Sequence, residues 1–311
     1  MKANASEHIK TEVNHRMTIR EWVLIFVLSL IWGASFFFVE VAVVTMTPFT
    51  IVMVRVGMAA AALWGFVLAT GRRMPSSPGI WAGLIALGAM NNVLPFSLIT
   101  WGQTIIESGL ASILNAFSPV FSALLAHFLT REERLTPNRL VGVAFGWIGV
   151  AILIGVTSLS GDSRAAIAQV AVLGAALLYA FAAIFGRRFK DLDPVVVAAG
   201  MLTGSTLIMI PLTFALEQPF GLEPTALTWA ALVCLALVST ALAYIIYFYV
   251  LARAGATNIL LVTFLIPVSA IFLGAVILGE SLSWNAFAGM AMIFAGLAAI
   301  DGRVFNWIKK R

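Results

Sequence analysis

The chain has 311 residues, of which 61% are hydrophobic and only 11% are charged. Soluble globular domains carry charge on about a quarter of their residues, so this composition excludes an ordinary soluble domain and predicts a polytopic membrane protein. The formal net charge of +5 does not indicate nucleic-acid binding, because the basic residues cluster at the ends of apolar segments, where the positive-inside rule places them.

Ten apolar runs along the chain are long enough to cross a bilayer, which takes about 20 helical residues. An outer-membrane barrel would instead show alternating segments of about ten residues, so we expect an all-α polytopic membrane protein. The predicted helices cover residues 22–43, 48–70, 79–101, 106–129, 138–157, 168–187, 194–215, 227–250, 257–278 and 283–302.

The charge distribution predicts how the chain sits in the membrane. Residues 1–20 read as an uncleaved cytoplasmic tail, and residues 303–311 as a basic cytoplasmic tail. With the N-terminus inside, nearly all basic residues fall on the cytoplasmic side, the exceptions being Arg164 outside and Arg55 within a span. We therefore expect a bacterial inner-membrane protein with both termini in the cytoplasm.

The second half of the chain repeats the first, most clearly where residues 256–297 echo residues 108–150. The predicted repeats are 21–157 and 158–302. The matching positions pair Pro119 with Pro267, Glu132 with Glu280, Gly142 with Gly289, and Gly149 with Gly296. Because each half holds five helices, an odd number, the second half must enter the membrane from the opposite side. Inverted repeats of this kind are typical of alternating-access transporters with a binding site near the midplane.

Polar and aromatic side chains gather at mid-depth in the first, third, fourth, sixth, eighth and ninth helices. A single Ser or Thr commonly bonds its own helix carbonyl, but two adjacent asparagine amides must find partners away from water, so we expect Asn91 or Asn92 to face a cavity. Trp101 belongs either to an aromatic belt or to the cavity mouth. The candidate substrate-binding residues are Trp32, Ser35, Asn91, Asn92, Trp101, Asn115, Ser118, Tyr179, Ser239, Tyr244 and Thr263.

Three prolines lie near these groups, and each frees a backbone carbonyl within a membrane helix. Pro95, Pro119 and Pro267 are therefore candidate points of gating and flexure. Among the charges, Arg55 and Glu40 are predicted to pair across the short turn that holds Pro48 or to snorkel towards the interface, in preference to a role in transport. No carboxylate falls at mid-depth, which favours either facilitated transport or an exchange whose coupling the sequence does not reveal. We expect an uncharged cavity lined by aromatic and amide groups, which suits a solute that is neutral overall.

Other functions find little support in the sequence. The single cysteine, Cys234, argues against a disulfide or a metal site, and no catalytic constellation occurs at depth. We therefore expect no enzyme activity, catalytic residue, metal or cofactor. The expected partners are a small-molecule substrate and the lipid bilayer, not nucleic acid. The Gly142 and Gly146 motif favours close packing within a monomer, with a dimer as the alternative.

Several segments together resemble the EamA-type branch of the drug/metabolite transporter superfamily. They are LIWGASFFFVEVAV in the first helix, PFTIVMVRVGMAAAAL with Pro48 and Arg55 in the second, and GLASILNAFSPVFSALLAHFLTREERL in the fourth. The resemblance implies ten helices in an inverted five-plus-five arrangement around a central cavity. The chain is similar to YddG-like aromatic amino-acid exporters, which implies export of aromatic or neutral amino acids and related metabolites. The alternatives are a multidrug or other metabolite carrier and, least favoured, a non-transport membrane protein.

Overall fold

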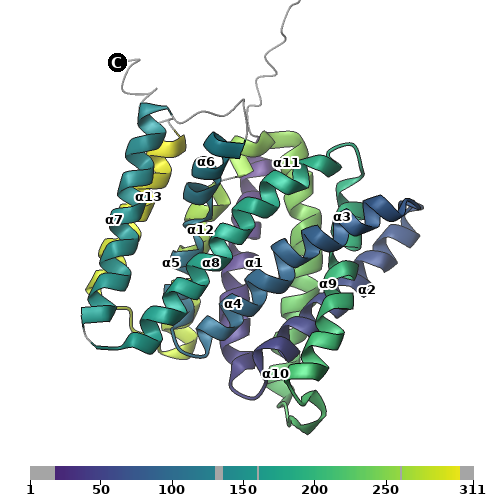
Figure 1. The fold of residues 1–311 in the computed structure, drawn as a ribbon, viewed down its shortest axis with the longest axis horizontal. Helices are drawn as coiled ribbons and strands as arrows, with labels where there is room; N and C mark the ends of the chain where they lie inside the picture. Colours follow the sequence, from purple (N-terminus) through teal and green to yellow (C-terminus); the bar gives the residue numbers. More distant parts are fainter. Residues whose placement is uncertain (1–17, 130–135, 160, 260, 302–311) are drawn as a thin grey trace, which may run out of the picture.

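The computed structural model describes residues 18–129, 136–159, 161–259 and 261–301, and these form helices and connecting turns without any β-strand (Figure 1). Ten helical segments are long and apolar enough to span a membrane, which confirms the predicted all-α fold class. The tails and the acidic turn containing Glu132 lie outside the described residues. The segments are α1 (Ile19–Val43), α2 (Pro48–Ala69), α3–η1–α4 (Pro78–Gly88, Ala89–Val93, Leu94–Gln103), α5–α6 (Ser108–Asn115, Ser118–Leu129), α7 (Pro137–Leu159), α8 with the 3-10 turn η2 (Ser163–Gly186, Arg187–Phe189), α9 (Pro194–Leu216), α10–η4–α11 (Ala226–Val233, Cys234–Leu242, Ala243–Ile259), α12–η5 (Leu261–Leu273, Gly274–Leu278) and α13 (Trp284–Asp301).

Local signals decide where the helices begin. Proline occupies the first position of α2, α3, α7 and α9, where its missing N–H would be unpaired in any case. The helix α8 starts at Ser163, five residues before the predicted boundary, because the Asp162 carboxylate accepts a hydrogen bond from the Ala165 N–H at 2.9 Å. A hydropathy window misses such a polar first turn, since capping rather than apolar character sets the start of the helix.

Three spans are interrupted near their middle. The third and eighth contain π-helical stretches, η1 and η4, at corresponding places in the two halves. The fourth breaks between α5 and α6 around Ala116 and Phe117, where the sequence predicts one continuous helix. Pro119 explains the break because it cannot donate the hydrogen bond that continues an α-helix. Its sequence counterpart Pro267 lies within the continuous helix α12, so the two prolines have different local structures.

A glycine seam joins the two halves of the molecule where α7 lies beside α13 (Figure 1). A Cβ atom added to Gly142 would lie 2.4 Å from the Gly296 carbonyl oxygen, and one added to Gly149 would lie 2.6 Å from that of Gly289. The two helices therefore run antiparallel. Since α7 and α13 are equivalent in the repeat, their antiparallel contact supports an inverted arrangement of the halves. It also places the glycine motif inside the monomer.

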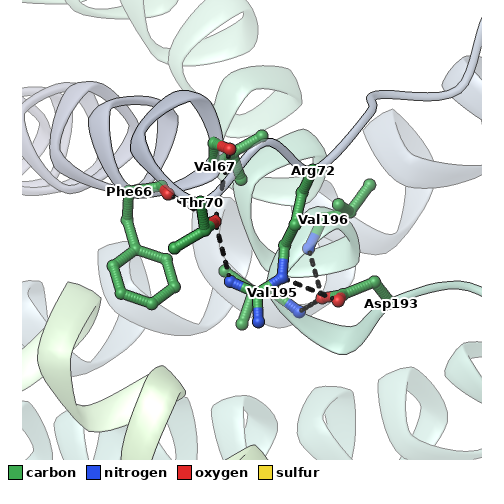
Figure 2. A network of polar contacts seen from close by, with 7 residues as sticks. All are labelled: Phe66, Val67, Thr70, Arg72, Asp193, Val195 and Val196. Atoms are coloured by element: carbon green, nitrogen blue, oxygen red, sulfur yellow. Dashed lines mark hydrogen bonds and ion pairs between the residues drawn. The ribbon is translucent and has the colours of Figure 1, made fainter.

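An ion pair joins the turn after α2 to the residue that precedes α9, as Figure 2 shows. The Arg72 Nε atom lies 2.8 Å from the Asp193 Oδ2 atom. The Asp193 Oδ1 atom also accepts hydrogen bonds from the Val195 and Val196 N–H groups and so caps α9. Both charged side chains are about one-third exposed, and exposed pairs contribute at most about 1 kcal/mol. The pair therefore positions the loop between α8 and α9 more than it stabilises the fold.

Candidate functional site

A cavity of about 670 Å³ lies among the helices, a volume suited to a small molecule. Its walls come from the six spans in which the sequence predicts mid-depth polar groups, namely α1, α3–α4, α5–α6, α8, η4–α11 and α12. The second and seventh spans also contribute, through Arg55 of α2 and three residues of α9. The lining contains no residue of α7 or α13, which meet along the glycine seam.

Nine of the candidate substrate-binding residues line this cavity: Trp32, Ser35, Asn91, Asn115, Ser118, Tyr179, Ser239, Tyr244 and Thr263. Among the candidate flexure residues, Pro119 lines it, whereas Pro95 and Pro267 do not. The side chain of Trp101 is 39% exposed and does not line the cavity, so the interpretation as a lid over its mouth is not supported. Asn92 is fully buried behind the wall.

The asparagine pair and Tyr244 form a hydrogen-bonded triangle. The Asn91 Nδ2 atom donates to the Tyr244 Oη atom at 2.9 Å and to the Asn92 Oδ1 atom at 3.1 Å, and the Tyr244 hydroxyl donates to Asn92 Oδ1 at 2.9 Å. Asn92 then donates to the Ser205 hydroxyl on α9 at 3.0 Å. The two adjacent amides thus have different surroundings. Asn91 faces the cavity, and Asn92 connects three helices behind it.

The π-helical turn η1 accounts for this division of the asparagine pair. Pro95 has no N–H with which to bond the Asn91 carbonyl four residues earlier, and the backbone instead widens into a π-turn over Ala89–Val93. Such turns are rare and occur frequently at functional sites. Hydrophobic periodicity does not reveal a π-turn, but a proline four residues after a mid-span asparagine can indicate one.

The break in the fourth span presents an amide to the cavity. The Ser118 hydroxyl donates at 2.7 Å to the Asn115 carbonyl, which is the carbonyl that Pro119 leaves without a helical donor. The Asn115 side-chain oxygen Oδ1 is buried and has no hydrogen-bond partner among the residues that the structure describes. A buried acceptor without a donor costs about 1–3 kcal/mol, so this position favours a ligand that can donate a hydrogen bond.

Aromatic rings form much of the remaining wall. Trp32 and Tyr247 lie with their ring centroids 5.5 Å apart, and Tyr247 packs edge-on against Phe248 at 5.2 Å. Both Tyr247 and Phe248 line the cavity, although sequence reasoning did not include them. Their position one helical turn after Tyr244 could have indicated them. Rings arranged in this way suit an apolar or aromatic ligand.

Arg55 does not pair with Glu40, contrary to the prediction from the sequence. Its Nε atom donates to the Thr240 hydroxyl at 2.9 Å, and its guanidinium carbon lies 3.6 Å from the centroid of the Phe96 ring. Glu40 instead accepts a hydrogen bond from Gln103 at 3.0 Å. Since Arg55 lines the cavity, the expectation of an uncharged cavity is also wrong.

The two ends of the cavity differ. At one end the lining reaches the segment between α8 and α9, including Arg187 and Lys190. At the other, the Glu280 carboxylate accepts hydrogen bonds from the backbone N–H groups of Ser108 at 3.0 Å and Gly109 at 3.1 Å. These donors belong to the first turn of α5, where they have no partner within the helix. The carboxylate thereby holds the chain after η5 against the start of α5.

Two carboxylates lie close together at the contact between Glu280 and the start of α5. Burial raises the pKa of Glu107, the residue just before α5, and the neighbouring Glu280 carboxylate raises it further, whereas a hydrogen bond from the Ser281 backbone opposes the shift. Gly279 precedes Glu280 with a φ of 73°, a left-handed conformation that glycine adopts without steric cost. This turn aims the Glu280 carboxylate back towards α5, so its hydrogen bonds to the start of α5 depend on Gly279.

Comparison with known proteins agrees with this architecture. The EamA-like transporter family matches the chain twice, over residues 20–155 and 166–300. A probable terminal-alkyne amino-acid exporter of Streptantibioticus cattleyicolor is 30% identical over 67% of this chain and 69% of its own length. A probable amino-acid metabolite efflux pump of Salmonella typhimurium is 28% identical over 90% of this chain and 94% of its own. One solved crystal structure has a similar fold, with a TM-score of 0.66 at 18% identity, covering 90% of this chain and 97% of its own.

Proposed function

Because the chain belongs to the EamA-like transporter family, we propose that it exports neutral and aromatic amino acids, or closely related small metabolites, across the bacterial inner membrane. The observation that carries this proposal is the cavity itself, in which aromatic rings surround a few polar groups at mid-depth. The names of two relatives, an amino-acid exporter and an amino-acid metabolite efflux pump, give the same substrate class. The residues proposed to contact substrate are the nine candidates that line the cavity.

Alternating access between two five-helix halves, residues 21–157 and 158–302, is the proposed mechanism, within a monomer. By the positive-inside rule, the end bearing Arg187 and Lys190 faces the cytoplasm together with both termini. The cavity then faces the cytoplasm in the described conformation, while Glu280 and the first turn of α5 close the outer end. A solute entering from the cytoplasm would leave after this closure opens and the cytoplasmic end closes.

Pro119 and Pro267 are the proposed flexure points of this motion, because each lacks one backbone hydrogen bond. Replacing both by alanine is expected to slow efflux while leaving substrate binding within about twofold, since the residues act on the movement of helices. Labelled phenylalanine supplies both measurements, as efflux from proteoliposomes and as equilibrium binding in detergent. Unchanged efflux in the double variant would remove the flexure proposal, with each single variant serving as a control.

Efflux from liposomes tests the proposed function directly. Proteoliposomes loaded with a labelled amino-acid mixture are expected to release a neutral and aromatic subset faster than protein-free liposomes, and a pH gradient across the membrane tests coupling. Trp32→Ala should lower efflux at low substrate roughly 2- to 10-fold, since an aromatic contact contributes about 0.5–1.5 kcal/mol beyond burial. Phe26→Ala is the matched control, because Phe26 lies on the same helix but is 56% exposed and does not line the cavity.

Two results would count against this proposal. Release of no amino acid would overturn the substrate class and direct the same assay to drugs and other metabolites, the alternative cargo of this superfamily. Equal efflux by Trp32→Ala and the wild type would show that the aromatic wall of the cavity does not contribute to transport.

A further inference from the structure

The cavity contains a buried cation for which the described residues provide no counter-ion. Arg55 lies about two turns into α2, is only 8% exposed and lines the cavity. Within the part of the chain that the structure describes, no carboxylate pairs with it; the one ion pair found there joins Arg72 to Asp193. Among the described residues that line the cavity, none is an aspartate or a glutamate. An uncompensated charge in such a place is costly, and buried charges are normally paired.

Neutral groups fix the orientation of this guanidinium. Thr240 accepts the hydrogen bond from Arg55 Nε at 2.9 Å and donates its own hydroxyl proton to the Leu235 carbonyl at 2.8 Å. This second bond runs across the π-helical stretch η4 and directs a lone pair of the threonine oxygen at Arg55. The Phe96 ring lies under the guanidinium at 3.6 Å. A protein hydrogen bond therefore holds Nε, while among the described residues none engages either terminal nitrogen, Nη1 or Nη2.

Two terminal nitrogens in one plane match the two oxygens of a carboxylate. Arginine binds planar carboxylates bidentately, and such charge-assisted hydrogen bonds are roughly twice as strong as neutral ones. The basic residues at the cytoplasmic end of the lining, Arg187 and Lys190, add a positive potential that attracts an anionic group towards the cavity. A phosphate would call for further cations at the same depth, and the lining offers none beside Arg55.

We propose that Arg55, oriented by Thr240 and Phe96, is the subsite that binds the carboxylate of the transported solute. This inference rests on the proposed function and narrows it. The cargo carries a carboxylate next to an apolar or aromatic body, and molecules of the same shape without that carboxylate are excluded. Arg55 would then determine specificity, since its charge is compensated only when a carboxylate occupies the cavity.

A ligand series on the wild-type protein gives the first test. Labelled phenylalanine is competed with phenylalaninamide, phenethylamine and 3-phenylpropionate in detergent at pH 7. Removing the carboxylate, as in phenylalaninamide and phenethylamine, is expected to weaken binding by roughly 10- to 100-fold, the range for hydrogen bonds between charged groups. 3-Phenylpropionate, which lacks the amine but keeps the carboxylate, should still compete. Competition by phenethylamine equal to that by phenylalanine would overturn the proposal without any variant.

Variants of Arg55 give the second test. In Arg55→Gln the preference for phenylalanine over phenylalaninamide should collapse to within about threefold, because affinity for the acid falls while affinity for the amide stays. Arg55→Lys keeps the positive charge but loses the planar pair of terminal nitrogens that binds a carboxylate bidentately. It should recover part of the preference for phenylalanine over phenylalaninamide. Arg73→Gln is the matched control, since it removes an exposed arginine just after α2 that does not line the cavity, and it should leave the preference unchanged. Size-exclusion profiles and melting temperatures establish that each variant is folded.

The outcomes separate this inference from the proposed function. If Arg55→Gln weakens acid and amide equally, Arg55 has a purely structural role and the subsite proposal fails while amino-acid transport stands. If the wild type binds no amino acid, the proposed function fails. Benzoate against benzamide then tests the carboxylate subsite alone, and equal binding of these two probes would overturn it.

Discussion

Gly296→Leu is expected to abolish accumulation of the folded protein. A Cβ atom at this position would lie 2.5 Å from the Gly142 carbonyl oxygen and 2.9 Å from the Gly146 backbone nitrogen. Both are backbone atoms of α7 and cannot turn away as a flexible side chain can. The helices would have to separate along the seam, and overpacking of this severity exceeds the usual cost of about 1–3 kcal/mol. Fluorescence-detected size-exclusion chromatography of the expressed variant measures the effect.

Gly65→Leu is the control for this prediction. Gly65 lies in α2, and an added Cβ would meet no atom within 4 Å, so the larger side chain should fit and the helix should gain from losing a glycine. Normal yield of both variants with unchanged melting temperatures would show that α7 and α13 do not approach as closely as described.

Glu280→Ala is expected to open the outer end of the cavity. The carboxylate accepts two backbone hydrogen bonds from the start of α5, and hydrogen bonds to charged groups contribute about 1.5–3 kcal/mol each. Losing both should shift the conformational equilibrium by about 3 kcal/mol or more, a change of over a hundredfold. A cysteine replacing Ile99, which lines the cavity and is 7% exposed, reports the opening through its reaction with an impermeant thiol reagent.

The labelling experiment requires a background in which Cys234 is replaced by alanine and the reagent is added only outside. Cysteine at position 99 should react slowly when Glu280 is present and much faster in Glu280→Ala. Glu223→Ala is the control, because Glu223 is an exposed carboxylate in the loop before α10. Equal labelling in all three backgrounds would mean that Glu280 does not hold the outer end closed.

Much of the architecture could be predicted because it depends on local sequence properties. The ten spans follow from runs of about 20 apolar residues, and the correspondence of Gly142 with Gly289 in the two repeats follows from repetition of the sequence itself. The mid-depth residues Asn91 and Tyr244 could be placed near one another because position along a span approximates depth in the membrane. The position of polar residues along the spans therefore predicts the depth of the cavity in the membrane without any knowledge of contacts between helices.

Contacts between distant helices could not be predicted in the same way. The sequence predicts that Arg55 pairs with Glu40, which lies in the preceding span. Its partner in the structure is Thr240, 185 residues away. The rotation of each helix about its axis decides such a contact, and hydropathy does not specify it. The π-turns add a further difficulty, because one extra residue in a turn changes which side chains after it face inward. This is why the sequence could not tell which of Asn91 and Asn92 lines the cavity.

The seam between α7 and α13 has the symmetry of an interface in a homodimer. The contact of Gly142 with Gly296 and that of Gly149 with Gly289 exchange when each glycine is replaced by its counterpart in the other repeat. In an oligomer such a contact is called isologous, because the same patch is used by both partners. Along this seam each half of the chain therefore presents two glycines to the matching glycines of the other half, as the two partners of an isologous interface do.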